Sequence, residues 1–314
     1  MPRDVAREDP ARPEPEAEGA NPRAWPYPTE LHPLVRDFPA DQEESLESVA
    51  RTIKAGAPDP RARLEALHDW IADRIAYDAV ALEEDNIPRQ DAKSVFATRR
   101  AVCAGYANLF KAMAEVTGDE VVVVVGDART DVDEIGGGGH AWNAAKLEGQ
   151  WTLIDATWDA GHVKGRVFTK RYSTNYLMTP AEIFGVDHFP AEERWQLRER
   201  PLSRGDFMRQ PMLRAQFFTH GSRLRRPTRS QVTVSSTFEA SFDNPRNAFV
   251  LAQLSEKGAS GRDFQERCTV SLGPRVDIGC KLPRDGVYRV QLFAGREKFG
   301  RYQHAGTFEA VSRR

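Results

Sequence analysis

The spacing of hydrophobic residues predicts three helices in the first part of the chain. Apolar side chains recur three or four positions apart over residues 45–56, 60–77 and 102–116. Gly118 follows the third run, and glycine commonly ends a helix. Between 78 and 93 the pattern loosens around a proline, so this stretch is predicted to be a loop.

The period then changes from helical to extended. A β-branched run over 120–125 predicts a buried strand. Residues 140–147 and 151–158 are typical of two strands joined at Glu148 and Gly149, which predicts a hairpin. The polar stretch 127–139 ends in four glycines, and we interpret it as a mobile loop that precedes the hairpin.

The remainder of the chain predicts a second domain. Short alternating runs separated by turn residues are typical of a small all-β sandwich, and they lie at 231–235, 248–251, 269–272 and 286–293. The proline-rich residues 1–30 are expected to be a disordered tail, because they bury little apolar surface. We therefore expect an α+β domain over 31–202 and an immunoglobulin-like β-sandwich over 203–314.

Composition excludes several classes of function. The chain has 314 residues with 44 basic and 46 acidic side chains, so its formal charge of −2 favours neither nucleic acid nor anionic lipid. No run reaches the roughly 18 apolar residues that a membrane helix needs. The first residues lack the apolar core of a signal peptide. We expect a cytoplasmic protein that binds neither nucleic acid nor membrane.

The cysteine and histidine spacings argue against a metal or disulfide framework. Three cysteines are too few for such a framework. Cys268 and Cys280 are expected to be free thiols, or a disulfide in an oxidising compartment. Neither a Cys-x-x-Cys nor a His-Glu-x-x-His motif occurs, so no metal and no cofactor are expected.

Cys103 stands at the start of a predicted helix, where it could act as a nucleophile. A helix N-terminus favours the thiolate over the thiol. It also presents backbone N–H groups that can stabilise an oxyanion beside the sulfur. The alternative is a small buried core residue, which is common for a free cysteine.

The predicted hairpin would bring a base and an acid to one face. If the turn is centred on Glu148 and Gly149, the residue numbers of each facing pair add up to 297, so that Trp142 faces Asp155. His140 and Asp155 then become diagonal neighbours on the same face. A three-residue turn would place them on opposite faces. With the first register, a nucleophile, a base and a base-orienting acid can assemble.

Three further residues are candidates for the surroundings of this site. Gln90 could donate the second hydrogen bond to an oxyanion, although a polar loop residue is the alternative. Trp142 and Trp158 flank the site and could form a substrate wall, or they could serve packing alone.

The motifs around these residues resemble the transglutaminase-like cysteine domains, and especially the kyphoscoliosis peptidase-like subgroup. The matching strings are AVCAGYANLF at 101–110, GHAWN at 139–143 and WTLIDATW at 151–158, with further matches at 68–73, 75–78, 176–180, 188–190 and 195–197. The resemblance implies a papain-like core in which a Cys-bearing helix packs on an antiparallel sheet. It assigns Cys103 as nucleophile, His140 as base and Asp155 as orienting acid. Asp159 departs from the subgroup's glycine and is expected to alter the mouth of the site.

These features lead to an enzyme hypothesis and two alternatives. A Cys103 thioester resolved by water would make the protein a peptidase or amide hydrolase acting on proteins or peptides. Resolution by a primary amine would make it a protein-glutamine transamidase. The third hypothesis is a non-catalytic scaffold on the same fold. Under each of the three hypotheses, the β-domain could bind a protein partner.

Overall fold

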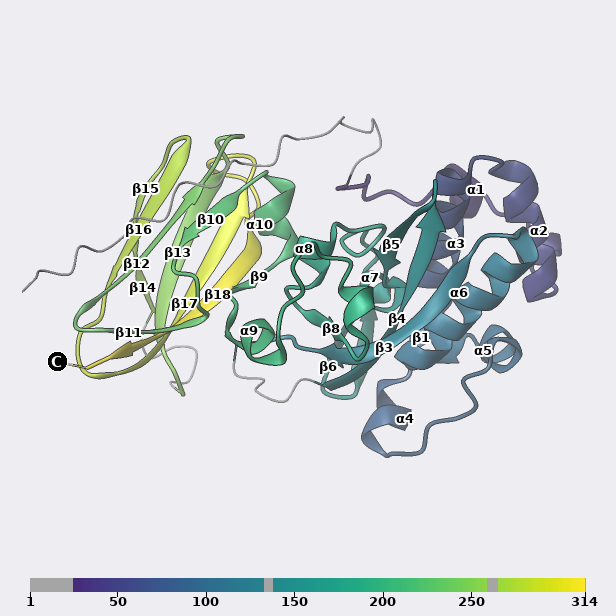
Figure 1. Cartoon of the computed structure of the whole chain (residues 1–314), viewed down its shortest axis with the longest axis horizontal. Helices are drawn as coiled ribbons and strands as arrows, with labels where there is room; N and C mark the ends of the chain where they lie inside the picture. The colour runs from purple at the N-terminus through teal and green to yellow at the C-terminus, as the bar shows by residue number, and fades with distance from the viewer. Residues whose placement is uncertain (1–24, 133–137, 259–264, 314) are drawn as a thin grey trace, which may run out of the picture.

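The computed structural model describes residues 25–132, 138–258 and 265–313 (Figure 1). The expected tail boundary at residue 30 is wrong, because the chain is already packed at Trp25. The Trp25 Nε1 donates to the carbonyl of Asn175 at 3.1 Å, and Tyr27 is only 6% exposed. Burial of the Tyr27 ring and partial burial of the Trp25 ring offset the entropy cost of ordering this proline-rich segment. Residues 1–24 lie outside the described part.

Helices dominate the region before the first sheet. Their bounds are α1 Pro33–Arg36, η1 Ala40–Gln42, α2 Leu46–Gly56, α3 Pro60–Arg74, α4 Ala79–Glu83, α5 Ala92–Thr98 and α6 Cys103–Thr117. Side-chain caps explain where several begin: Ser45, Asp59 and Asp91 each accept a backbone N–H of the first turn. Gly118 ends α6 with φ +83°, as predicted.

Two of these boundaries correct the sequence-based expectation. The helix expected over 60–77 stops at Arg74, because residues 76–77 form strand β1 (Ala76–Tyr77). This strand pairs in parallel with β2 (Arg100–Ala101), directly before α6. The loop expected over 78–93 contains helix α4, which Asp78 caps. The Asp78 side chain accepts the Ala81 N–H and so starts a helix where the hydrophobic spacing alone did not predict one.

A four-stranded antiparallel sheet follows in the order β5-β4-β3-β8. Its strands are β3 Val121–Ala128, β4 Gly138–Leu147, β5 Gln150–Ile154 and β8 His188–Pro190. Residues 133–137 of the predicted glycine-rich loop lie outside the described part, and 138–139 already belong to β4. The β4–β5 pairs run from Leu147–Gln150 to Asn143–Ile154, each summing to 297. The predicted hairpin register is therefore confirmed.

The second hairpin strand is shorter than expected. It ends at Ile154, and the next residues form helix α7 (Ala156–Ala160), with Asp155 as its N-cap. Thr157 consequently does not lie opposite His140. The chain continues through strands β6 (Gly161–Lys164) and β7 (Val167–Lys170), helix α8 (Ala181–Phe184) and the 3-10 helix η2 (Glu193–Gln196).

Helix α6 lies against the sheet, next to β3 and β4 (Figure 1). Tyr106, Phe110 and Met113 of this helix are fully buried in the core. The Asn143 amide of β4 donates to the carbonyl of Ala107 in α6 at 3.0 Å. A cysteine-bearing helix on an antiparallel sheet is the papain- and transglutaminase-like α+β core that the sequence predicted.

The C-terminal region consists of two β-sheets around one apolar core, with Phe238, Tyr288 and Phe308 at its centre. The first sheet is β10 (Arg223–Arg226), β12 (Thr237–Asp243), β16 (Arg275–Lys281) and β15 (Thr269–Ser271). The second is β11 (Gln231–Val234), β18 (Gln303–Ser312), β17 (Gly286–Gly295), β13 (Phe249–Glu256) and β14 (Gln265–Arg267). All four predicted runs are strands.

The segment that enters this region is not all-β. Helix α9 (Arg204–Arg209), strand β9 (Met212–Leu213) and helix α10 (Ala215–Thr219) precede the sandwich, and β9 pairs with β18. The domain boundary at 203 and the immunoglobulin-like assignment stay predictions.

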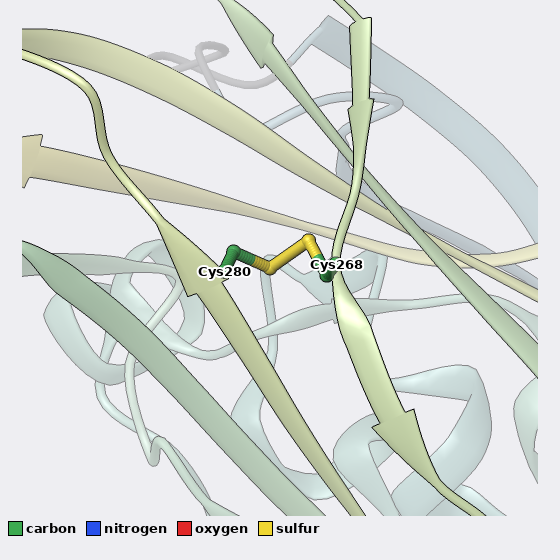
Figure 2. Close-up of a disulfide and its surroundings, with 2 residues drawn as sticks. All are labelled: Cys268 and Cys280. Carbon is green, nitrogen blue, oxygen red and sulfur yellow. A yellow bond between two sulfur atoms is a disulfide. The ribbon is translucent and has the colours of Figure 1, made fainter.

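A disulfide joins Cys268 and Cys280 across adjacent segments of the sandwich (Figure 2). Cys268 lies between β14 and β15, where the chain passes from one sheet to the other, and its N–H donates to Ala252 of β13 at 3.0 Å. Pairing of Thr269 with Gly279 brings the two cysteines opposite each other. The expectation of free thiols is wrong. Because disulfides persist in oxidising compartments, this pairing lends no support to a cytoplasmic location, which stays a prediction.

None of the helices in the described residues is long and apolar enough to cross a lipid bilayer.

Candidate active site

Cys103 is the first residue of α6, and its side chain is half-buried. Val102 precedes it as N-cap in an extended conformation and supplies no side-chain cap. The Gly105 N–H of the first turn donates to the Val102 carbonyl at 2.9 Å. The N–H groups of Cys103 and Ala104 have no partner among the described residues, so these two are available to an anion beside the sulfur.

Gln90 lies beside this helix start, but both ends of its amide are engaged. Its Oε1 accepts the Val102 N–H at 3.0 Å, and its Nε2 donates to the Pro88 carbonyl at 2.9 Å. Gln90 therefore fixes the backbone that leads into Cys103. The structure does not present it as the second oxyanion donor.

His140 lies between the thiol and a carboxylate. Its Nε2 is 2.7 Å from Oδ2 of Asp155, which leaves Nδ1 for the hydrogen bond with Cys103. Burial disfavours the charged ring, but the charge of Asp155 and the hydrogen bonds to Asp155 and Cys103 outweigh it. They raise the pKa of His140 to about 10. The imidazole is thus held as a cation, oriented by Asp155 and facing the sulfur of Cys103.

Asp155 is 1% exposed and has two structural roles at once. Its Oδ1 caps helix α7 by accepting the N–H groups of Thr157 at 2.8 Å and Trp158 at 3.3 Å. Burial would raise the pKa of Asp155, but the adjacent charges and hydrogen bonds of His140 and His188 lower it below its usual range. The strand ends and the helix begins at this residue, so the backbone itself fixes the acid.

His188 is a site residue that the sequence reasoning missed. Its Nε2 is 3.1 Å from the same Oδ2 of Asp155 that binds His140, and its Nδ1 is 2.7 Å from Oδ1 of Asp187. The remaining Oδ2 of Asp187 accepts the Tyr176 hydroxyl at 2.5 Å. The only signal in the sequence was the match at 188–190, which drew attention to the motif without assigning its histidine a contact.

Aromatic rings enclose this second histidine. Their centroids lie between 4.1 and 5.3 Å from that of His188, and they belong to Phe184, Trp158, Trp142, Tyr176 and His140. Such a shell excludes water and strengthens the hydrogen bonds inside it. The acid therefore holds its two histidines in a dry, closely packed environment.

The two candidate tryptophans have different positions. Trp142 is 1% exposed and packs edge-on against His188, so it belongs to the core behind the site. Trp158 is half-buried, its ring centroid is 5.5 Å from that of His140, and it lines a cavity. Only Trp158 is in a position to form a substrate wall.

The cavity beside His140 has a volume of about 630 Å³, which is ample for several atoms of a peptide. Tyr77, Trp158 and Phe168 supply aromatic surface, and Arg214 reaches it from the C-terminal region. Burial is the main cause that raises the pKa of Tyr77, and the charges of Cys103 and Asp155 add to it. Tyr77 therefore remains a neutral hydroxyl near the thiol.

A metal could find ligands at one place among the described residues. The side-chain donor atoms of His140, Asp155 and His188 lie within 4.8 Å of one another. The two imidazole Nε2 atoms already share one carboxylate oxygen through hydrogen bonds, so a metal would have to replace both bonds.

Asp159 does not lie at the mouth of the site, as the sequence suggested. It is fully buried, and its carboxylate is 3.1 Å from Nε2 of His68 on helix α3. Burial opposes the charge on His68, but hydrogen bonds with Asp159 and Asp69 raise its pKa to about 9. This ion pair fastens α3 to α7 beneath the site.

Comparison with known proteins agrees with this geometry. Residues 47–156 match the model of the transglutaminase-like superfamily. The kyphoscoliosis peptidase of Mus musculus is 31% identical over 244 residues, which are 74% of this chain and 35% of the relative. The kyphoscoliosis peptidase of Homo sapiens is 30% identical over a stretch of the same length and the same shares.

The chain spans about a third of the length of these curated relatives (35%). A crystal structure of a TGase overlies 42% of this chain and 34% of its own, with 19% identity and a TM-score of 0.32. The chain belongs to the transglutaminase-like superfamily, in which it groups with the kyphoscoliosis peptidases.

Proposed function

We propose that this protein is a cysteine peptidase or amide hydrolase that acts on proteins or peptides through a thioester on Cys103. The observation that carries the proposal is a single line of contacts: Cys103 to His140, and His140 Nε2 to Asp155 at 2.7 Å. A nucleophile, a base and an orienting acid in this order are the parts that acyl transfer requires.

The proposed reaction has two halves. Because the His140 imidazolium already holds the Cys103 proton on Nδ1, the sulfur attacks the carbonyl carbon of an amide as a thiolate. N–H groups at the start of α6 stabilise the oxyanion. The C–N bond then breaks as the imidazolium gives its proton to the leaving amine. Water next gives a proton to His140 and attacks the thioester, which releases the acid and restores the Cys103 thiolate beside the imidazolium.

The surroundings of the three residues support catalysis over a purely structural role. A scaffold has no physical need to bury a carboxylate and hold it ionised beside an imidazolium, since an uncompensated charge in the core is costly. Here Asp155 is compensated by two histidines and two backbone N–H groups. The open cavity beside His140 gives a substrate access to the pair.

Labelling with iodoacetamide tests the proposal. We expect one fast-reacting thiol in the oxidised wild-type protein and none in Cys103→Ala. His140→Ala should slow the labelling of Cys103, whereas the matched control His220→Ala, which changes a histidine of helix α10's end, should not. Equal labelling rates in wild type and His140→Ala would remove the base from the proposal.

Product analysis then separates hydrolysis from amine transfer. The protein is incubated with a denatured, glutamine-containing protein in the presence and absence of a fluorescent primary amine. New peptide termini or released ammonia without amine incorporation support the hydrolase. Covalent incorporation of the amine into the substrate supports the transamidase instead. Neither product, with an unreactive Cys103, supports the scaffold.

A further inference from the structure

A second hollow continues from the cavity beside His140 toward the C-terminal sandwich. Its volume is about 800 Å³, and it shares Trp158, Gly161, His162 and Arg214 with the first cavity. We call this hollow the interdomain groove. One wall comes from the segment 171–176 of the α+β region, and the other comes from 214–216 and 301–304 of the β-rich region.

The lining of the interdomain groove is basic. Among its sixteen residues are Arg171, Arg214 and Arg301, and none is an aspartate or glutamate. The whole chain has slightly more acidic than basic side chains, 46 against 44, so the lining departs from the general surface. Burial lowers the pKa of His304, which leaves the arginines as the fixed charges.

Within the described part of the chain, the side chains of two of these arginines have no ion-pair partner. Arg171 and Arg301 are exposed, and neither forms an ion pair with any residue of the described ranges. Carboxylates beneath the groove are already engaged. Asp187 binds His188 and Tyr176, and Asp159 is buried against His68 and Ser173. Glu297 lines an adjoining hollow, and Asp131, whose charge acts on His304, is paired with Arg289.

Arg214 connects the groove to the reaction site. It is the N-cap residue of helix α10, and its guanidinium donates to the carbonyl of Thr130 and lies 3.8 Å from Oδ2 of Asp187. It lines both hollows. The β-rich region therefore supplies a charged residue to the cavity in which His140 lies.

We propose that the interdomain groove binds an acidic segment of the protein substrate next to the bond that Cys103 attacks. Arg171 and Arg301 attract the carboxylates, while Gln216, Gln303 and Asn175 can hydrogen-bond to an extended peptide backbone. Recognition is thus shared between the two regions of the chain. The assignment to substrate rests on the proposed function, but binding of an acidic peptide can be measured without catalysis.

Fluorescence anisotropy with the full-length Cys103→Ala protein tests the binding step. The probe is a fluorescein-labelled eight-residue peptide of alternating Glu and Gly, with a Lys–Gly peptide of equal length as comparison. We expect the acidic peptide to bind in low salt and the basic one not to bind. We also expect the Kd to rise about tenfold or more on raising the salt from about 0.05 to 0.5 M, because exposed charges are screened.

Charge reversal locates the site. The double variant Arg171→Glu/Arg301→Glu is expected to weaken binding about tenfold or more, because two attractions become repulsions. Arg51→Glu/Arg229→Glu is the matched control, since these exposed arginines lie outside the groove. Each pair changes the formal charge by −4, from −2 to −6. An equal loss in both variants would overturn the proposal, as would an eight-nucleotide oligothymidylate that binds as tightly as the acidic peptide.

A kinetic measurement distinguishes this inference from the proposed function. With Cys103 intact, the Arg171→Glu/Arg301→Glu variant should keep the wild-type rate of iodoacetamide labelling. It should also lose kcat/KM selectively for substrates with acidic flanks. If Cys103 proves unreactive while groove-dependent peptide binding persists, the proposed function fails and the groove stands as a binding site. Intact catalysis with no preference for substrates with acidic flanks would overturn the proposed role of the groove and leave the proposed function in place.

Discussion

Replacing Asp155 by Asn removes one charge and keeps most of the shape. The Asn carbonyl can still cap helix α7, because asparagine is as good an N-cap as aspartate. Its amide would then face the Nε2 atoms of His140 and His188 as a donor instead of an acceptor. His140 would bind this amide through an unprotonated Nε2 and carry its proton on Nδ1, toward the sulfur. In that tautomer it cannot accept the thiol proton.

The size of the effect follows from the charge that Asp155 stabilises. The pKa of His140 lies at about 10 compared with an ordinary 6.5, and Asp155 is the largest cause that raises it. Each pKa unit corresponds to a factor of ten in the stability of the imidazolium. We therefore expect the Asp155→Asn substitution to lower the labelling rate of Cys103 by at most roughly 10³-fold. We also expect the unfolding free energy to fall by about 1–3 kcal/mol, because buried donors lose a charged partner.

Iodoacetamide labelling of Cys103 at pH 7.5 measures this loss, and urea unfolding measures the stability. Asp91→Asn is the matched control, since Asp91 caps α5 in the same way but is far more exposed. The control should label at the wild-type rate. A labelling rate of Asp155→Asn within about threefold of wild type would refute the role of the acid, because a tautomer error alone costs far more.

Three further predictions concern His188, the disulfide and His140. His188→Phe should lower kcat about tenfold and move the acid limb of the pH profile to higher pH, because Asp155 loses a hydrogen-bond donor that lowers its pKa. His188→Gln should restore part of both effects, and an unchanged profile in His188→Phe would show that His188 is only structural. Reducing the disulfide between Cys268 and Cys280, which lie 12 positions apart in the sequence, should lower the free energy of unfolding in urea by about 3 kcal/mol. No change would show that the disulfide does not constrain the unfolded chain. The pKa of His140 is raised in the folded state, so the stability that its charge contributes should be complete below about pH 6.5 and vanish as the pH rises through about 10. The difference in unfolding free energy between wild type and His140→Gln should therefore narrow over that pH range. A constant difference would contradict the raised pKa of His140.

The hairpin register could be predicted because its determinants are local. Glu148 and Gly149 both adopt positive φ, at +52° and +83°, which is the conformation of a tight two-residue turn. Once that turn is fixed, the strand period decides which side chains share a face. The proximity of His140 and Asp155 followed from these two facts, although the strand was expected to continue four residues too far.

His188 could not be predicted in the same way. It lies 33 residues beyond Asp155, in the three-residue strand β8 at the opposite edge of the sheet. A strand this short has no measurable period, and its pairing with β3 depends on the intervening helices. The register Ala128–His188 emerges only from the packed sheet.

The predictions for the two cysteines and for the N-terminal segment were wrong for related reasons. Cys268 faces Cys280 because the chain changes sheets between β14 and β15, which no local pattern reports. Tyr27 is ordered by distant partners, among them the Thr174 hydroxyl and the Arg61 guanidinium. In both cases tertiary contacts overrode the composition of the segment.

Trapping the acyl intermediate tests most directly whether Cys103 forms a thioester. The protein is mixed with an activated ester of a short acidic peptide, quenched in acid within seconds, digested and analysed by mass spectrometry. We expect the mass of the acyl group on the peptide that contains Cys103 in the wild-type protein, and no such mass in His140→Ala. An acyl group on any other residue, or the same adduct yield in His140→Ala, would contradict this expectation.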